Sequence, residues 1–311
     1  MNCVTRRQGP VVTLVAMLIA LLLLAPLLAI AQDGRILSRV SFPSSNGNYH
    51  AEEITYLSDG LRINGYLLTP SGEGKHPCVI YNRGGNPQLN GLSREALSRG
   101  HAVVLATAGY MVVLSHYRQG GGSEGHDQFG GDDLNDVLNL IPLLEREPGC
   151  DTSRIGMIGF SRGGMMTYLS LKRTERIRAA AVISGSADLV LNLKSRPEMA
   201  KVYEGLIPGY ASHPEELLAE RSAVRWAQKI NKNTPILVLH GSSDWRVVPT
   251  EALEMADAFL RFKQPFRFVM FEGGGHGLPE FTQEVDRLVV NWFNDYLRDR
   301  KTWPSLDTHG Q

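Results

Sequence analysis

Short apolar runs alternate along the chain with segments in which apolar residues recur at helical spacing. Apolar runs of about four to eight residues bounded by turn residues predict buried strands, and 3-4 spacing predicts helices. The expected strands lie at 77–81, 110–116, 155–160, 179–183, 235–239 and 266–271, and the expected helices at 101–108, 132–147, 165–172, 250–262 and 281–297. This alternation predicts an α/β fold with a mostly parallel central sheet and helices on both faces.

The pattern opens differently, with two segments joined by a turn. Residues 53–57 and 62–69 flank Ser58-Asp59-Gly60, and Asp-Gly is a strong turn signal between strands. We therefore expect an antiparallel hairpin before the first parallel strand.

The pattern changes again over residues 186–233, where polar helix formers, prolines and aromatic residues are mixed. The sheet pattern resumes directly afterwards, at 235–239. We interpret the segment as a short helical lid inserted into the sheet domain. Its candidates for substrate contact, or for packing within the lid, are Tyr203, Tyr210, Arg221 and Trp226.

An apolar stretch at residues 11–31 lies outside this alternation. Arg6-Arg7 precedes it, and it closes with Ala29-Ile30-Ala31 before polar residues. A positive flank, an apolar stretch and small residues at its end predict a signal peptide at 1–31 and an exported domain at 32–311, in the periplasm or the medium. The stretch is also long enough to cross a bilayer, so an uncleaved membrane anchor is the alternative.

The charge balance argues against two classes of partner. The chain has 32 basic and 32 acidic residues and no run of like charges, so no net field favours nucleic acid or an anionic membrane surface. Its 43% apolar content is ordinary for a packed globular protein. Its three cysteines form no metal-type Cys/His cluster, and we expect no metal and no organic cofactor.

A candidate nucleophile stands in Gly159-Phe160-Ser161-Arg162-Gly163, which matches the G-x-S-x-G elbow. The elbow is a sharp turn from a strand to a helix that exposes the serine oxygen and points the positive end of the helix at the site. Ser161 has this context, because it stands between the apolar run 155–160 and the helical run 165–172. A second copy centred on Ser123 is followed by more loop, so we interpret Ser161 as the nucleophile.

The other two catalytic candidates follow from chain order, since an α/β-hydrolase carries Ser, acid and His in that order. Asp244 comes just after the run 235–239, and loops at the C-terminal ends of such strands carry function. Beyond it only His276 and His309 remain, and His309 is next to the C-terminus. His276 follows the next expected strand in a glycine-rich loop that can fold back over Ser161, so we predict that His276 is the base and Asp244 orients it. Taken singly, Asp244 could merely cap a helix and His276 could be a surface histidine. Their joint order after Ser161, each behind its own strand, favours a triad.

The negative oxygen of a tetrahedral intermediate needs fixed hydrogen-bond donors. The backbone N–H of Arg162, directly after the nucleophile, is expected to supply one. The second is expected from the loop after the run 77–81, at Arg83-Gly84-Gly85, where glycines permit close approach of the backbone. A plain glycine turn is the alternative for this loop.

With these residues placed, the chain resembles the catalytic domain of the prolyl oligopeptidase family of serine peptidases. The matching segments are Tyr81-Asn82-Arg83-Gly84-Gly85-Asn86, His116-Tyr117-Arg118-Gln119-Gly120-Gly121, Gly130-Gly131-Asp132-Asp133, Gly159-Phe160-Ser161-Arg162-Gly163-Gly164, His240-Gly241-Ser242-Ser243-Asp244, Val247-Val248-Pro249 and Gly275-His276-Gly277. The resemblance implies the α/β-hydrolase fold and the triad Ser161, Asp244 and His276.

Two departures from the family pattern concern the substrate. Family members often carry a large β-propeller before the hydrolase domain, and the stretch between residue 32 and the first buried strand is too short for one. Several relatives place Tyr or His where Arg83 stands and use that position as an oxyanion donor. Both departures weaken the peptidase interpretation more than the hydrolase one, and the domain is also similar to related secreted esterases.

Within such a sheet, the strands that carry Cys78 and Ile155 would be neighbours, and Cys150 stands shortly before the second of them. A Cys78–Cys150 disulfide is therefore a hypothesis, which an exported compartment would permit. Two buried, unpaired cysteines are the alternative.

Three functions stay open at this point. The first is hydrolysis of a peptide or amide bond in a small-molecule or short-peptide substrate, through an acyl-enzyme on Ser161. The second is the same chemistry on a carboxylic ester, because the triad is common to both. The third is an inactive binding protein of the same fold, against which the intact triad argues.

Overall fold

The computed structural model describes residues 33–87 and 92–309 of the chain. The expected signal peptide or anchor lies outside the described residues. Within the two described ranges, no helix combines the length and the apolar character that a membrane span requires.

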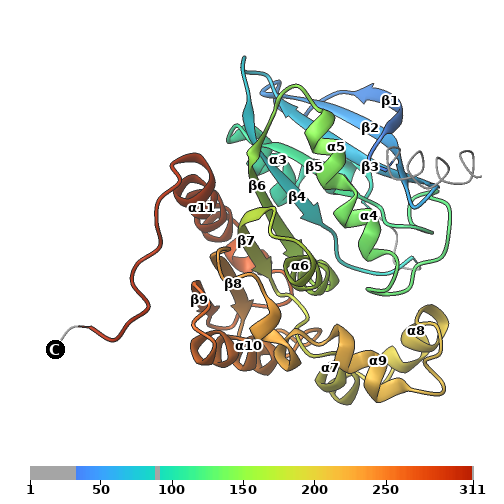
Figure 1. Ribbon diagram of the computed structural model, residues 1–311, viewed down its shortest axis with the longest axis vertical. Coiled ribbons are helices and arrows are strands. Elements are labelled where there is room, and N and C mark those ends of the chain that lie inside the picture. The colour runs from blue at the N-terminus through green and yellow to red at the C-terminus, as the bar shows by residue number, and fades with distance from the viewer. Residues whose placement is uncertain (1–32, 88–91, 310–311) are drawn as a thin grey trace, which may run out of the picture.

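The centre of the molecule is a nine-stranded sheet in the order β1-β2-β3-β5-β4-β6-β7-β8-β9 (Figure 1). The strands from β5 to β9 in this order run parallel, whereas β1, β2 and β3 join at one edge in antiparallel pairs. The strands are β1 (Ile36–Phe42), β2 (Tyr49–Ser58), β3 (Leu61–Pro70), β4 (His76–Asn82), β5 (Met111–Ser115), β6 (Cys150–Phe160), β7 (Ile177–Ile183), β8 (Ile236–Gly241) and β9 (Phe266–Phe271). The expected mostly parallel sheet of an α/β-hydrolase fold is confirmed.

Helices cover both faces of the sheet, because its central parallel strands are apolar on both sides. One face packs against α4 (Leu134–Leu138), α5 (Leu140–Arg146), α6 (Arg162–Arg173) and α10 (Pro249–Arg261). The other packs against α2 (Arg94–Ser98), α3 (His101–Thr107), α11 (Thr282–Phe293) and the short π-helix η4 (Asn294–Arg298). The two hydrophobic clusters lie on opposite sides of the sheet, and the middle strands contribute to both.

The prediction of a single helix over 132–147 is wrong, because the structure divides this segment into α4 and α5 at Asn139. Pro142 lacks the N–H that would bond to the carbonyl of Leu138, and its ring crowds that carbonyl. The side chain of Asp133 also accepts hydrogen bonds from the N–H groups of Gly130 and Gly131, at 2.9 to 3.0 Å, so the segment before α4 is a turn.

Two elements have no counterpart among the sequence-based expectations. Strand β1 is an edge strand without a buried residue, and Val40 in its middle is 54% exposed, so it lacks the alternation by which a half-buried strand is detected. Helix α2 has only five residues, too few to establish helical spacing.

The segment 186–233, predicted as a lid, stands between β7 and β8 in the chain and contains helices and 3-10 turns. It contains α7 (Leu189–Ser195), α8 (Met199–Leu206) and α9 (Pro214–Arg221), followed by the 3-10 turns η1 (Ala223–Arg225) and η2 (Ala227–Lys229). Figure 1 shows these helices grouped beyond the C-terminal ends of the parallel strands, beside α10. This position is where a lid over a strand-end site would lie.

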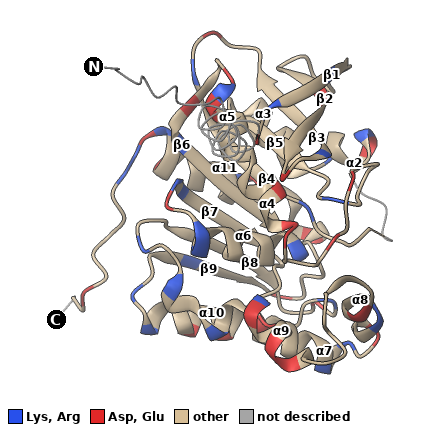
Figure 2. Ribbon diagram, turned by 45° about the vertical axis from the view of Figure 1, so that its right-hand side comes forward, with Lys and Arg blue, Asp and Glu red and all other residues tan. Residues whose placement is uncertain are grey.

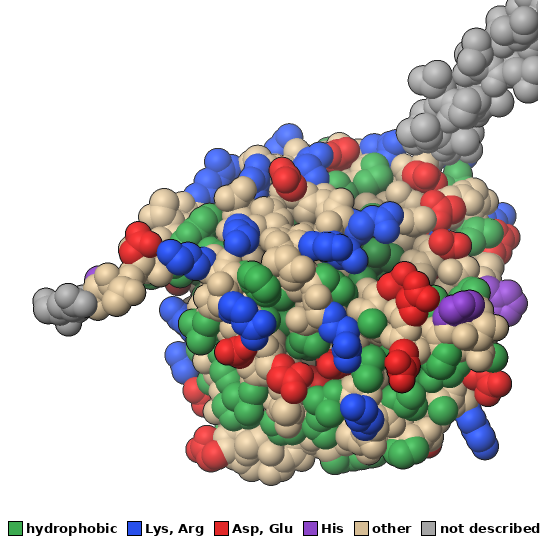
Figure 3. Space-filling view, turned by 60° about the horizontal axis from the view of Figure 1, so that its bottom comes forward, with side chains coloured by type: hydrophobic (Ala, Val, Ile, Leu, Met, Phe, Trp, Pro, Cys, Tyr) green, Lys and Arg blue, Asp and Glu red, His purple; other side chains and the backbone are tan. Residues whose placement is uncertain are grey.

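Charged residues of both signs are spread along the chain rather than gathered by sign (Figure 2). Figure 3 looks onto the lower part of the molecule as drawn in Figure 1, and it shows basic and acidic side chains interspersed with hydrophobic ones. The equal numbers of basic and acidic residues therefore correspond to a mixed surface on this face, without a field of one sign.

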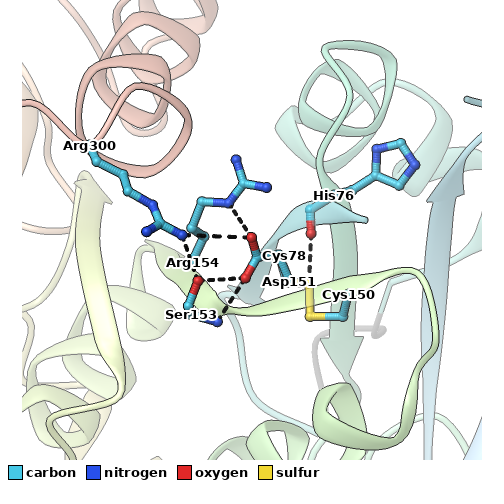
Figure 4. Close-up of a disulfide and its surroundings, with 7 residues drawn as sticks. All are labelled: His76, Cys78, Cys150, Asp151, Ser153, Arg154 and Arg300. Carbon is cyan, nitrogen blue, oxygen red and sulfur yellow. Dashed lines mark hydrogen bonds and ion pairs between the residues drawn. A yellow bond between two sulfur atoms is a disulfide. The ribbon is translucent and has the colours of Figure 1, made fainter. Parts of the chain in front are cut away.

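Cys78 and Cys150 form a disulfide between β4 and β6 (Figure 4). Strand β6 begins earlier than expected, so that Cys150 pairs with His76 on β4 and the two Cα atoms of the cysteines lie 5.9 Å apart. That separation is within the usual range for a disulfide. The bridge thus joins residues 72 positions apart at the start of two central strands.

Candidate active site

The turn between β6 and α6 holds Ser161 in a conformation that a serine rarely adopts. Its φ is 54° and its ψ is −123°, which only a strongly constrained turn imposes on a residue with a side chain. The two flanking glycines are required by close approach: a Cβ on Gly163 would lie 1.9 Å from the carbonyl oxygen of Asn82, and one on Gly159 would lie 2.1 Å from the carbonyl oxygen of Gly163. The packing of α6 on the sheet therefore explains the G-x-S-x-G spacing.

The structure brings the three predicted triad residues together at one rim of the sheet. Ser161, Asp244 and His276 follow β6, β8 and β9 respectively. His276 Nε2 lies 3.0 Å from Ser161 Oγ, and His276 Nδ1 lies 2.9 and 3.1 Å from the two carboxylate oxygens of Asp244. With a proton on Nδ1, the imidazole donates to Asp244 and accepts the hydroxyl proton of Ser161, which is the geometry of a nucleophile and its general base.

Asp244 is buried and held by more than the histidine. The backbone N–H groups of Arg246 and Val247 donate to its Oδ1 at 2.9 and 3.0 Å. Burial alone would raise the pKa of Asp244, but the hydrogen bond and the charge of His276, together with the Val247 N–H, outweigh it and hold the pKa below its ordinary value. The carboxylate therefore stays ionised beside the imidazole.

The loop that carries His276 is fixed by hydrogen bonds on both sides of the residue. The N–H of Gly275 donates to Glu280 Oε2 at 3.1 Å, and the N–H of Gly277 donates to Ser184 Oγ at 3.0 Å. The glycine-rich sequence that suggested a folding-back loop therefore forms a well-anchored turn that presents the imidazole to the nucleophile.

Two backbone segments lie beside Ser161 where an oxyanion would form. Arg162 is the first residue of α6, so its N–H has no acceptor within the helix. A Cβ placed on Gly84 would lie 3.0 Å from Ser161 Cβ, so the main chain of Gly84 packs against the nucleophile. A side chain at position 84 would therefore crowd Ser161.

The side chain of Arg83 is turned away from that position. Its Nε donates to the carbonyl of His116 at 3.0 Å, its Nη1 donates to the carbonyl of Gly84 at 3.0 Å, and its guanidinium lies 4.6 Å from the ring centroid of Tyr117. These contacts pin the loop after β4 to the loop after β5. The guanidinium of Arg83 thus connects these two loops.

Arg162 also has a role that sequence analysis missed, because its side chain is buried with two carboxylates. Its guanidinium bonds to Asp127 at 2.7 and 2.8 Å and to Asp133 at 2.7 Å, and it lies 4.4 Å from the ring centroid of Phe129. Burial by itself would lower the pKa of Arg162, but the two aspartates raise it above its usual value. An arginine in the buried elbow requires counter-charges, and this requirement is the feature of the sequence from which buried acidic partners could have been predicted.

A pocket of about 180 Å³ opens beside Ser161. Helices α7 and α8 of the lid and the segment between them contribute four side chains, namely Asn192, Arg196, Met199 and Tyr203. The other lining residues are Gly85, Asn86, Phe129, Phe160, Ser161, Arg162, Ser186, Arg246, Val247 and His276. The segment predicted as a lid therefore forms part of the pocket wall.

Of the four lid candidates, only Tyr203 lines this pocket. Arg221 is buried and donates to the carbonyl of Phe129 at 2.9 Å, and Trp226 is buried with its Nε1 donating to the carbonyl of Glu220 at 3.0 Å. Arg221 thus joins the segment 186–233 to the loop after β5, whereas the Trp226 contact lies within the segment. Tyr210 packs on Tyr203, with ring centroids 6.0 Å apart.

A buried carboxylate behind the pocket anchors the start of the lid, and sequence analysis missed it as well. Glu251 on α10 accepts hydrogen bonds from the N–H groups of Ala187 and Asp188 at 2.8 and 3.0 Å, and Asn192 Nδ2 lies 3.4 Å from it. Burial raises the pKa of Glu251 to about 7, although the two N–H groups oppose the rise. Asn192 links this anchor to the pocket, since its Oδ1 accepts from the Tyr203 hydroxyl at 3.0 Å.

In the part of the chain that the structure describes, no three His, Cys, Asp or Glu side chains gather in a way that would hold a metal ion.

Comparison with known proteins identifies the family. The profile of the prolyl oligopeptidase family matches residues 96–300. The chain is 27% identical over 267 residues to the uncharacterized peptidase YtmA of Bacillus subtilis, which covers 85% of this chain and 100% of YtmA. It is also 27% identical over 235 residues to dipeptidyl-peptidase 5 of Porphyromonas gingivalis, which covers 72% of this chain and 34% of that protein.

Solved structures share the fold. The acylaminoacyl peptidase of Pyrococcus horikoshii superposes with a TM-score of 0.71 at 21% identity, over 84% of this chain and 44% of the other. The acetyl xylan esterase 1 of Thermoanaerobacterium superposes with a TM-score of 0.63 at 17% identity, over 85% of this chain and 90% of the other. The chain thus spans less than half of the longer peptidases that it matches. The residues matched by the family profile, 96–300, include all three predicted triad residues. The chain belongs to the prolyl oligopeptidase family.

Proposed function

We propose that the protein is a serine peptidase that cleaves a peptide or amide bond of a small substrate through an acyl-enzyme on Ser161. The observation that carries the proposal is the hydrogen-bonded relay from Asp244 through His276 to Ser161, at 2.9 and 3.0 Å. Membership of the prolyl oligopeptidase family and the peptidases among the relatives support an amide substrate.

In the first half of the reaction, Ser161 Oγ attacks the carbonyl carbon while His276 Nε2 takes the hydroxyl proton. The carbonyl oxygen becomes an oxyanion, for which the N–H of Arg162 and the backbone at Gly84 are the proposed donors. The C–N bond then breaks, and His276 returns its proton to the leaving amine. The acyl group remains on Ser161 as an ester.

In the second half, a water molecule takes the place of the serine hydroxyl. His276 accepts a proton from the water, the resulting hydroxide attacks the acyl carbon, and the bond to Ser161 Oγ breaks as His276 returns the proton to that oxygen. Asp244 stays ionised throughout, because its pKa lies below the ordinary range, and it stabilises the imidazolium that forms in each half.

The proposal is tested by labelling and by paired substrates. A fluorophosphonate probe is expected to label the protein, and the Ser161→Ala variant is expected to remain unlabelled. An N-acylated peptide anilide and its matched aryl ester are expected both to be hydrolysed by the unmodified protein. Hydrolysis of the ester alone would instead indicate a carboxylic ester hydrolase, and a folded protein that resists labelling would indicate a binding protein.

We also propose that the domain is exported. Two features support this proposal: the signal-like sequence at 1–31, and the Cys78–Cys150 disulfide, since disulfides persist in oxidising compartments. Fractionation of expressing cells, with N-terminal sequencing of the product, is expected to find the chain outside the cytoplasm and beginning near Gln32. A full-length chain held in the membrane fraction would indicate the anchor instead.

A further inference from the structure

The pocket beside Ser161 is lined by three arginines and, among the described residues, by no carboxylate. The charge of Arg162 is balanced by the two buried aspartates that bond to it. Arg196 and Arg246 remain, and they reach the pocket from two segments about 50 residues apart in the chain. The pocket therefore has an excess of positive charge close to the nucleophile.

Arg196 follows α7 and is half-buried. Its Nε bonds to Glu198 Oε1 at 2.9 Å, but the side chain of Glu198 is 61% exposed, and an ion pair so open to water neutralises little charge. Its Nη1 also donates to the carbonyl of Arg246 at 3.4 Å. This contact ties the lid to the loop after β8 and keeps the guanidinium at the pocket.

Arg246 stands two residues after Asp244 and is exposed at the mouth of the pocket. No carboxylate of the described residues forms an ion pair with it, whereas its guanidinium lies 5.0 Å from the ring centroid of Trp245. The guanidinium of Arg196 lies 5.5 Å from the same ring. One indole thus holds two cations near each other, and an anion between them would relieve their repulsion.

We infer that Arg196 and Arg246 bind a carboxylate of the substrate, so that the enzyme favours short acidic peptides. A guanidinium matches a carboxylate with two parallel hydrogen bonds, and a pocket wall on one side strengthens such a bond by excluding water. The surface around the lid carries charges of both signs (Figure 3), so the preference comes from these two side chains and not from a long-range field. The inference rests on the proposed function and deepens it by naming the substrate class.

The carboxylate has two sources, an acidic side chain or the C-terminus of the peptide, and one binding experiment separates them. Calorimetry on the full-length Ser161→Ala protein uses three N-acetylated tripeptides of the same length: one with Gln and a C-terminal amide, one with Glu and a C-terminal amide, and one with Gln and a free C-terminal carboxylate. We expect one or both charged peptides to bind on the order of tenfold more tightly than the neutral peptide. The peptide that gains affinity identifies the source.

Variants locate the effect. In the Ser161→Ala background, Arg246→Met and Arg196→Met are each expected to reduce the ratio of charged to neutral affinity severalfold, and together to remove it. Lys194→Met is the matched control, because Lys194 is an exposed cation on α7 that does not line the pocket, and its ratio is expected to stay unchanged. Raising the ionic strength is expected to lower the ratio in the parent protein.

Equal binding of all three peptides to the parent pocket would overturn the inference, as would a ratio that survives in the double arginine variant. The comparison of ligands in the parent pocket is valid even if a variant fails to fold. The hydrolysis assay on the unmodified protein is independent of it. Peptide cleavage without charge preference would leave the proposed function intact and remove the inference. Charge preference without cleavage would remove the proposed function and leave the binding of a carboxylate by the two arginines intact.

Discussion

At the scale of single residues, the site depends on a backbone conformation at Ser161 that a residue with a side chain rarely adopts. Ser161 has a positive φ in the turn between β6 and α6, and its hydroxyl lies 3.0 Å from His276 Nε2. Gly159 and Gly163 are required beside it, because a Cβ at either position would lie 2.1 or 1.9 Å from a neighbouring main-chain oxygen. Strain and close packing here serve the placement of one oxygen atom.

Replacing Asp244 by Asn tests the orienting role of the acid. The Asn amide has no negative charge with which to stabilise the Nδ1–H of His276. It favours the tautomer that carries its proton on Nε2, so Nε2 can no longer act as the base. We expect kcat for an aryl ester to fall by a factor on the order of 10⁴. The measurement is steady-state hydrolysis, with Asp257→Asn on the exposed side of α10 as the control. A loss below about tenfold would show that His276 does not need this partner.

Replacing Asp127 by Asn tests the buried charge cluster around Arg162. Removal of one partner leaves a buried guanidinium with only Asp133 as its counter-charge, and breaking a buried pair costs about 3 to 5 kcal/mol of unfolding free energy. Urea unfolding measures this cost. Asp257→Asn breaks the exposed pair with Arg261 and is expected to cost less than about 1 kcal/mol. Similar costs for the two variants would contradict the assignment of the cluster as buried and stabilising.

At the scale of elements, the lid is attached to the sheet domain through a few defined contacts. Glu251, in the first turn of α10, binds the two N–H groups that lead into α7. The side chain of Asn192 on α7 then connects to Tyr203 on α8, and both residues line the pocket. Glu251 is therefore connected through hydrogen bonds to two residues of the pocket wall.

The pH dependence of stability tests this anchor. The pKa of Glu251 is raised in the folded state from 4.5 to about 7, so the unfolded chain releases this proton more readily than the folded one. The stability that Glu251 contributes is fully present below pH 4.5 and is lost as the pH rises through about 7. We expect the unmodified protein to lose about 3 kcal/mol relative to Glu251→Gln between pH 4.5 and pH 8.

Chemical unfolding of both proteins across this pH range measures the effect. Glu254→Gln is the control, because Glu254 is exposed on the same helix. A stability difference between the unmodified protein and Glu251→Gln that does not change with pH would contradict the raised pKa.

At the scale of the whole molecule, the disulfide connects two neighbouring central strands across 72 residues. Both cysteines are fully buried, so the bridge belongs to the core rather than to a surface loop. Closing a loop of this length restricts the unfolded chain, and such bridges contribute about 2 to 5 kcal/mol.

The Cys78→Ala, Cys150→Ala double variant is expected to lose free energy of unfolding in that range of about 2 to 5 kcal/mol. Urea unfolding without reductant measures the loss, and in the presence of reductant the difference between the two proteins is expected to shrink. Thiol titration of the unfolded, unreduced domain supplies the check on the bridge itself. Two free thiols at positions 78 and 150 would contradict it.

What could be predicted from sequence was local or ordered along the chain. The strand runs and the elbow around Ser161 are visible in short stretches, because the backbone itself imposes the hydrophobic period and the glycine spacing. Asp244 and His276 could be predicted from their order along the chain. The break at Asn139 was also available in principle, since Pro142 removes a single helical hydrogen bond. Strand β1 was not, because an exposed edge strand shows no alternation.

The amino-acid sequence alone determined the fold class, the family and the three residues of the predicted triad, because each depends on local pattern and chain order. Only the tertiary structure decided which charges meet. It placed Asp127 and Asp133 on Arg162, Glu251 under the lid, and Arg196 beside Arg246. Those pairings join segments about 30 to 60 residues apart, and electrostatic energy depends on distance in space, which folding sets and sequence spacing does not.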